Sequence, residues 1–163
     1  MGLVVREAIQ ADYPDISAVF DETHALHCAA LPQIFRDPGE PALSAEAVAA
    51  IIANPDAALL LAERDGLIAG LLQLGLASAQ DRPTLVPRRY VAIYSLAVRA
   101  GQRRSGIGRA LMEAAHRWAH ERGVDAIELN VWEFNAAARL FYEELGYTTA
   151  SRKMWISLAG SEV

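Results

Sequence analysis

The sequence predicts an α/β protein with a mixed, mostly antiparallel central sheet of about six to seven strands, flanked by four helices. Three observations support this fold class. Apolar runs rich in β-forming residues alternate along the chain with stretches whose apolar residues recur at helical spacing. Two apolar runs flank Asp65-Gly66, which is a strong hairpin signal. The nearly continuous apolar run from Tyr90 to Val98 predicts a strand at the centre of the sheet.

The ends of the expected elements carry local signals. Asp12 is an expected N-cap with Pro14 in the first helical turn, and Ser44 caps a second helix that Asn54-Pro55 ends. The expected helices follow Asp12 and span Ala45 to Ala53, Ala110 to Arg122 and Ala136 to Leu145. The expected strands are Leu3 to Glu7, Ala57 to Arg64, Leu67 to Ala77, Tyr90 to Val98, Ala126 to Trp132 and Met154 to Leu158.

The composition is that of an ordinary globular domain. The chain has 163 residues, of which 53% are hydrophobic and 21% charged, and this suits one domain over residues 1–163. We see no apolar run that could span a bilayer and no signal peptide, and the single cysteine, Cys28, cannot form an internal disulfide. We therefore expect a cytoplasmic protein with no membrane partner. A formal net charge of -5 disfavours nucleic-acid binding and is compatible with a cationic substrate.

One stretch departs from this acidity. From Arg99 to Arg109 the chain has four arginines, no acid, three glycines and, at its end, the start of a helical pattern. Free N–H groups at a helix start, the helix dipole and nearby guanidinium groups all favour a phosphate. A dinucleotide fingerprint fails because its third glycine position is Leu111, and no Gly-Lys-Ser/Thr tripeptide exists for a nucleotide-triphosphate loop. A plain strand-to-helix connection is the alternative interpretation of the glycines.

Two motifs carry a resemblance to a known family. The segment from Arg103 to Gly108 resembles the acetyl-CoA signature Q/R-x-x-G-x-G/A of the GNAT acyltransferase superfamily (Gcn5-related N-acetyltransferases), and Tyr94 to Val98 resembles the strand that pairs with the pantetheine arm. The segment from Asn135 to Tyr147 is similar to the family's other motif. The resemblance implies the acyl-CoA N-acyltransferase fold, acetyl-CoA as cosubstrate, and transfer of an acetyl group to an amine.

The resemblance also implies roles for individual residues. Amides from Arg104 to Gly108 would face the pyrophosphate, and the backbone of Leu96 and Val98 would pair with the pantetheine amides. Asn135 would bond the cofactor arm, and Tyr142 would be catalytic, donating a proton or hydrogen bond to the departing thiolate. The implied cofactor-binding residues are Leu96, Ala97, Val98, Arg103, Arg104, Ser105, Gly106, Ile107, Gly108, Arg109, Asn135 and Tyr142; no metal site is expected.

The general base stays open in the sequence. Many members of the family use a glutamate on the central strand, whereas Val91 to Val98 carries no carboxylate. This absence also motivates an alternative function, an acyl-CoA-binding sensor or structural module without catalysis. The acceptor, a small-molecule or peptide amine, and a possible homodimer are likewise open. The candidates for the base are Glu63, Glu133, His24, His27 and a water held by Tyr94 or Ser95.

Overall fold

The computed structural model describes residues 2–159 of the chain. These residues divide into two compact units, one up to Asn130 and one from Val131 onward. The elements of the first unit are β1 (Leu3–Glu7), α1 (Tyr13–Ala30), α2 (Ala45–Ala53), β2 (Ala57–Arg64), β3 (Leu67–Ser78), β4 (Arg89–Val98), α3 (Ile107–Glu121) and β5 (Ile127–Leu129). The second unit contains α4 (Ala136–Glu144).

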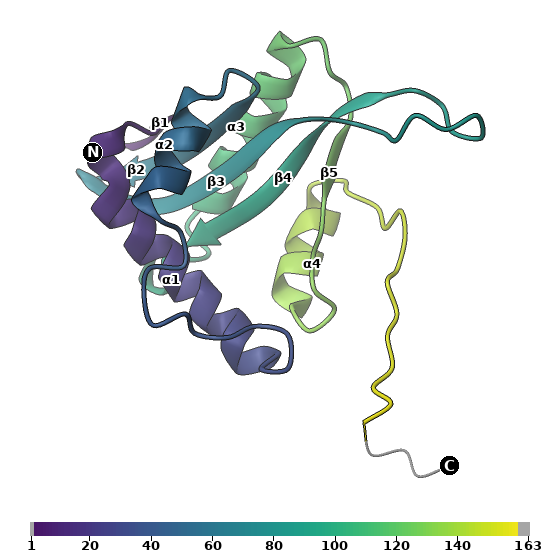
Figure 1. Ribbon diagram of the computed structural model, residues 1–163. Helices are drawn as coiled ribbons and strands as arrows, with labels where there is room; N and C mark the ends of the chain where they lie inside the picture. The colour runs from purple at the N-terminus through teal and green to yellow at the C-terminus, as the bar shows by residue number, and fades with distance from the viewer. Residues whose placement is uncertain (1, 160–163) are drawn as a thin grey trace. The chain divides into compact units, whose positions relative to one another are not determined.

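The sheet has the mixed, mostly antiparallel character that the sequence predicts. Its strand order is β1-β2-β3-β4-β5, with antiparallel pairing from β1 to β4 and parallel pairing between β4 and β5 (Figure 1). The β2–β3 hairpin turns at Asp65 and Gly66, whose φ angles of 53° and 78° suit the type of tight turn that matches the strand twist. The predicted hairpin is therefore confirmed.

The strand count predicted from the sequence is wrong. Within residues 2–159 the sheet has five strands, not six to seven. The expected strand at Met154 to Leu158 does not form there, and its apolar side chains are exposed, Met154 by 85%. A strand is stabilised by hydrogen bonds to a neighbouring strand, and the apolar pattern of one segment does not show whether such a neighbour lies beside it. The strand expected at Ala126 to Trp132 is reduced to β5 for the same reason, since only its first part pairs with β4.

Two of the helices show how their ends are set. Helix α3 begins at Ile107, three residues before the expected start, because Gly106 takes a left-handed conformation with φ of 85° and serves as the N-cap. Helix α4 begins where expected, because the Asn135 side chain accepts a hydrogen bond from the Ala138 N–H at 3.1 Å. The helix that follows Asp12 and the helix from Ala45 are also confirmed. The capping role expected of the Asp12 side chain is wrong, because its carboxylate accepts from Arg6 and from the Ile9 N–H and makes no cap hydrogen bond to α1.

The helices of the first unit cover both faces of its sheet (Figure 1). On one face α1 and α2 pack on β2 and β3 through a buried cluster that includes Ile16, Val48, Leu61 and Leu71. On the other face α3 approaches so closely that Gly70 cannot carry a side chain. A Cβ atom there would lie 2.8 Å from the Ala97 carbonyl oxygen and 2.9 Å from the Ile107 Cγ2 atom. The absence of a side chain at Gly70 therefore allows α3 to pack closely on β3 and β4.

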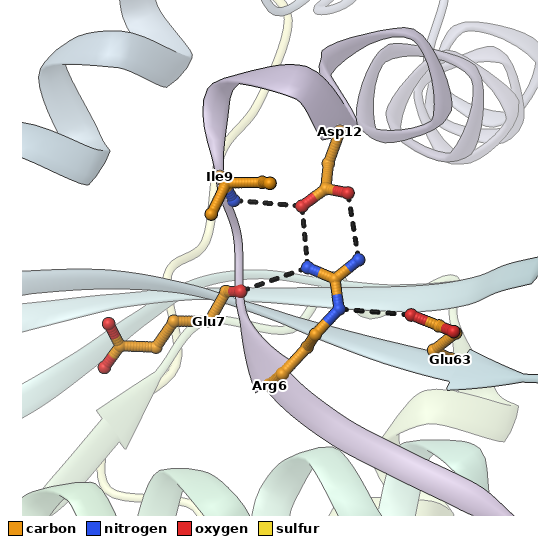
Figure 2. A network of polar contacts seen from close by, with 5 residues as sticks. All are labelled: Arg6, Glu7, Ile9, Asp12 and Glu63. Carbon is orange, nitrogen blue, oxygen red and sulfur yellow. Dashed lines mark hydrogen bonds and ion pairs between the residues drawn. The ribbon is translucent and has the colours of Figure 1, made fainter. Parts of the chain in front are cut away.

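A charged network ties the start of the chain to the hairpin (Figure 2). The Arg6 guanidinium donates two hydrogen bonds to the Asp12 carboxylate, at 2.7 and 2.9 Å, and a third to Glu63 at 3.1 Å. Asp12 also accepts from the Ile9 N–H at 2.9 Å. The hydrogen bond from Arg6 holds the pKa of the Asp12 carboxyl below its ordinary value of 3.8.

We expect Asp12→Asn to lower the free energy of unfolding by about 1–2 kcal/mol at pH 7, because Arg6 loses a charge-assisted partner. The pKa of Asp12 is lower in the folded than in the unfolded chain, so its stabilisation is present above about pH 3.8 and is lost as the pH falls further. Urea titrations at pH 7 and pH 3 should show the difference shrinking at pH 3. Asp125→Asn, an exposed site, is the control, and a pH-independent loss would contradict this assignment.

Candidate functional site

The predicted phosphate-binding turn connects the end of β4 to the start of α3. A short 3-10 turn, Ala100–Gln102, leaves the strand, and the backbone then takes positive φ angles at Arg104 (57°) and Gly106 (85°) before the helix begins. A non-glycine residue with positive φ is uncommon and marks a constrained backbone. We call residues 103–108 the glycine turn.

The backbone amides of the glycine turn are not engaged by the part of the chain that the structure describes. Among the described residues, no backbone N–H from residue 104 to residue 109 donates a hydrogen bond to the chain. The first N–H groups of a helix ordinarily lack partners, but here the run extends backward through the turn. A Cβ atom at Gly106 would meet nothing within 4 Å, so the backbone is open to a ligand. These are the properties of an anion cradle.

Side chains from other elements hold this connection. The Arg64 Nη2 donates to the Ser105 carbonyl at 2.9 Å, and the Glu22 carboxylate accepts from the Ala100 N–H at 2.6 Å. The Arg99 guanidinium bonds the Ile68 carbonyl at 2.8 Å and Asp15 at 3.2 Å. The turn is thus fixed from outside while its amides stay available.

The arginines of the glycine turn are exposed, and one of them contacts the neighbouring strand. Arg103, Arg104 and Arg109 all present their side chains to solvent. The Arg103 Nε donates to the Val98 carbonyl at 3.2 Å. Both residues are predicted cofactor contacts, so a ligand that pairs with the Val98 carbonyl must first displace Arg103. The local concentration of positive charge that the sequence predicts is present.

One edge of β4 is open next to the turn. Strand β5 pairs only with Val91, Ala92 and Ile93, and the β3 pairing shifts register at Tyr94, which marks a β-bulge. The Arg99 N–H bonds the Ala69 carbonyl, so by strand alternation Leu96 and Val98 direct their backbone groups to the side away from β3. No described strand pairs with that side, which is the arrangement an extended amide-bearing arm requires.

A shallow groove of about 260 Å³ lies at the bulge. It is lined by the end of α2, the start of β2 and the segment from Gln73 to Leu76, and by the exposed ring of Tyr94. Ser95 follows Tyr94 and pairs in register with Gln73. The two polar residues proposed for holding a water therefore lie together at the bulge.

The second unit holds the other predicted residues. Burial raises the pKa of Tyr142 to about 12, and its ring contacts Phe141 and Tyr147 at centroid distances of 5.3 and 5.9 Å. Tyr142 therefore keeps its proton at neutral pH. Asn135 caps α4 as the sequence predicts. Its side-chain oxygen Oδ1 accepts the cap hydrogen bond, which leaves the side-chain nitrogen Nδ2 for a ligand.

Three of the candidate bases are engaged elsewhere. Glu63 accepts from Arg6, and Glu133 accepts from Arg139 at 3.0 Å. The His24 Nε2 lies 2.9 Å from the Arg36 carbonyl, which can only accept, so this nitrogen carries the hydrogen. The same nitrogen lies 3.3 Å from the Cys28 sulfur and therefore cannot take a proton from the thiol.

The His27 Nδ1 lies 2.9 Å from the Thr23 carbonyl oxygen, so Nδ1 carries the hydrogen and Nε2 is the ring nitrogen that can accept a proton. In residues 2–159, no group of three or more His, Cys, Asp or Glu side chains is placed to hold a metal ion. Within the same residues, no helix is both long and apolar enough to cross a membrane.

The fold and the family of this chain are those of an acetyltransferase. The family model of the acetyltransferase (GNAT) family matches residues 20–147, and the chain belongs to that family. An N-acetyltransferase of Lactobacillus delbrueckii subsp. lactis, named for the pepI 3' region, is 26% identical over 157 residues, covering 95% of this chain and 90% of that protein. A mycothiol acetyltransferase of Beutenbergia cavernae is 46% identical over 56 residues, which are 34% of this chain and 19% of that protein.

Solved structures have the same fold. A crystal structure of a mutant BH1408 protein from Bacillus halodurans matches with a TM-score of 0.91 at 29% identity, covering 95% of this chain and 99% of that one. An aminoglycoside 6'-N-acetyltransferase from Acinetobacter baumannii matches with a TM-score of 0.71 at 16% identity, covering 96% and 97% of the two chains. The predicted family and fold class are confirmed.

Sequence reasoning missed the residues that brace the turn. Arg64 contacts Ser105 from 41 residues away and Glu22 contacts Ala100, just before the glycine turn, from 78 residues away, and no local pattern predicts either contact. Gly70 had a usable signal, because a glycine inside an apolar strand often marks a close backbone approach. The structure brings the glycine turn and the open edge of β4 together in the first unit, and Asn135 and Tyr142 lie in the second.

Proposed function

We propose that this acetyltransferase moves an acetyl group from acetyl-CoA directly to a primary amine of a small molecule or peptide. One observation carries the proposal: the unpaired amides of residues 104–109 follow the open edge of β4 after a short connection that includes the 3-10 turn Ala100–Gln102. Coenzyme A combines a pyrophosphate with an arm of amide groups, so it needs an anion cradle followed by a free strand edge. A simple anion-binding protein would have no use for the second feature.

The residues present fit this cosubstrate. The amides from Arg104 to Gly108 would hold the pyrophosphate, and Arg103 and Arg104 would supply charge. Leu96 and Val98 would pair with the pantetheine amides, and Asn135 would donate from its amide nitrogen. Acetyl-CoA supplies the activated acyl group, and binding both substrates on one protein removes the entropy of their encounter.

Tyr142 is our proposed catalytic residue. Acyl transfer expels a thiolate, and a thiol has an ordinary pKa near 8.5. A phenol whose pKa is about 12 is a weaker acid than that thiol, so it stabilises the thiolate chiefly by donating a hydrogen bond. Because burial raises its pKa, the Tyr142 hydroxyl stays protonated throughout the working pH range and can donate this hydrogen bond.

The amine must lose a proton before it attacks, because a free alkylamine has a pKa of about 10.4. Glu63 and Glu133 accept from arginines and the His24 Nε2 donates to a carbonyl, so we propose a water at the β4 bulge as the first acceptor, with the His27 Nε2 as the alternative. Tyr94 and Ser95 would orient that water.

The lone cysteine also supports our proposal of a cytoplasmic location, since disulfides are rare in that compartment.

Calorimetric titration with acetyl-CoA tests the first half of the proposal. We expect a dissociation constant between about 1 μM and 1 mM, the usual range for enzyme substrates. No heat at 1 mM ligand would overturn it. A panel of amines with detection of released thiol tests the second half. Thiol release above the hydrolysis rate with at least one amine is expected, whereas binding without release across the panel would favour the sensor alternative.

A further inference from the structure

We propose that Arg64 is a positioning residue for the cofactor: it fixes the orientation of one peptide group in the glycine turn so that the amides face the pyrophosphate. The inference rests on the proposed function and extends it to a residue outside the recognised motifs. Arg64 is the last residue of β2, and it lies directly before the hairpin turn at Asp65 and Gly66.

The contact is specific to one peptide unit. The Arg64 Nη2 donates to the Ser105 carbonyl at 2.9 Å. That carbonyl and the Gly106 N–H belong to the same planar peptide group and point in opposite directions. Drawing the oxygen toward Arg64 therefore directs the Gly106 N–H to the opposite side, among the unpaired amides of the cradle.

This peptide group needs an external restraint. It precedes Gly106, whose φ is 85°, and follows shortly after Arg104, whose φ is 57°. Glycine tolerates several backbone conformations, so rotation of the whole peptide group is easy at this point. A rotated group would aim a carbonyl oxygen at the phosphate, which would repel it. The hydrogen bond from a permanently charged guanidinium opposes that rotation.

The hairpin itself holds Arg64 in place. Arg64 pairs with Leu67 in the β2–β3 register, and the turn between them is of the tight type. The side chain thus extends from a rigid element, and the position of the guanidinium depends on the sheet rather than on the glycine turn. Preorganisation of this kind lowers the conformational entropy lost on binding.

The test compares Arg64→Ala, Arg64→Lys and the control Arg117→Ala by calorimetric titration with acetyl-CoA. Arg117 is exposed on α3, so the control removes the same charge without touching the turn. We expect Arg64→Ala to weaken binding about tenfold, Arg64→Lys to recover part of the loss, and Arg117→Ala to bind like the original protein. The Tm of all three variants should change little, since the contact is exposed.

A second ligand separates positioning from direct contact. Titration with 3'-dephospho-acetyl-CoA should show the same loss for Arg64→Ala, because the pyrophosphate is unchanged. A loss confined to the 3'-phosphorylated ligand would mean that Arg64 binds that phosphate directly, and equal affinity of Arg64→Ala and the original protein would also refute the inference. If the original protein bound neither ligand, the proposed function itself would fail.

Discussion

Replacing Tyr142 with phenylalanine is expected to lower kcat about a hundredfold while leaving the dissociation constant of acetyl-CoA within a factor of two or three. The substitution removes only the hydroxyl that would stabilise the departing thiolate and keeps the ring that packs against Phe141 and Tyr147. An interaction made only in the transition state affects kcat and spares ground-state binding.

Tyr147→Phe is the matched control. Burial also raises the pKa of Tyr147 to about 12, so the same hydroxyl is removed from a similar environment. We expect its kcat to stay within a few-fold of the original, because Tyr147 has no role in the proposed transfer. The pKa of Tyr142 further means that this residue causes no loss of rate between pH 7 and pH 10. Equal rates for Tyr142→Phe and the original protein would remove Tyr142 from the mechanism.

Replacing Gly106 with alanine is expected to weaken acetyl-CoA binding by about a hundredfold or more. The Cβ atom finds open space in the protein, so the steric conflict arises with the bound phosphate rather than with the chain. The positive φ of 85° adds a strain of about 1 kcal/mol, which falls on folding stability. The loss of affinity should therefore far exceed what a stability change alone explains.

Gly123→Ala separates these two effects. Gly123 also has a positive φ of 66° and open space around it, but it lies at the far end of the same helix. We expect a similar decrease in Tm for both variants, measured by thermal melts, and lost affinity for Gly106→Ala alone. A normal dissociation constant for Gly106→Ala would show that no phosphate approaches this backbone.

The elements that local signals define were predictable from the sequence. Asp65-Gly66 fixed the hairpin, and Ser44 and Asn135 fixed two helix starts, because turn and cap preferences act over a few residues. The strand predicted at Met154 to Leu158 was wrong, because strand pairing depends on a neighbour that is distant in the sequence. The start of α3 was missed because Gly106 acts through its backbone conformation rather than through a capping side chain.

In the candidate site too, features that depend on local sequence were predictable and features that depend on distant contacts were not. The glycines and arginines of the turn were visible as a motif, and their amides have the expected availability. The bulge at Tyr94 and the limited reach of β5 were not visible, since both follow from the register between strands. Arg64 was missed because its role depends on the hairpin bringing it beside a segment much later in the chain.

The extra residue in β4 has a consequence for how this strand can change during evolution or engineering. Because the bulge at Tyr94 offsets the two halves of the strand, a single-residue deletion there would restore one uninterrupted register with β3. In the straightened strand, β5 could pair with more of β4. The edge of β4 that we propose for the pantetheine arm would then be covered. We therefore expect point substitutions at Tyr94 to preserve the bulge and a deletion at this position to remove it.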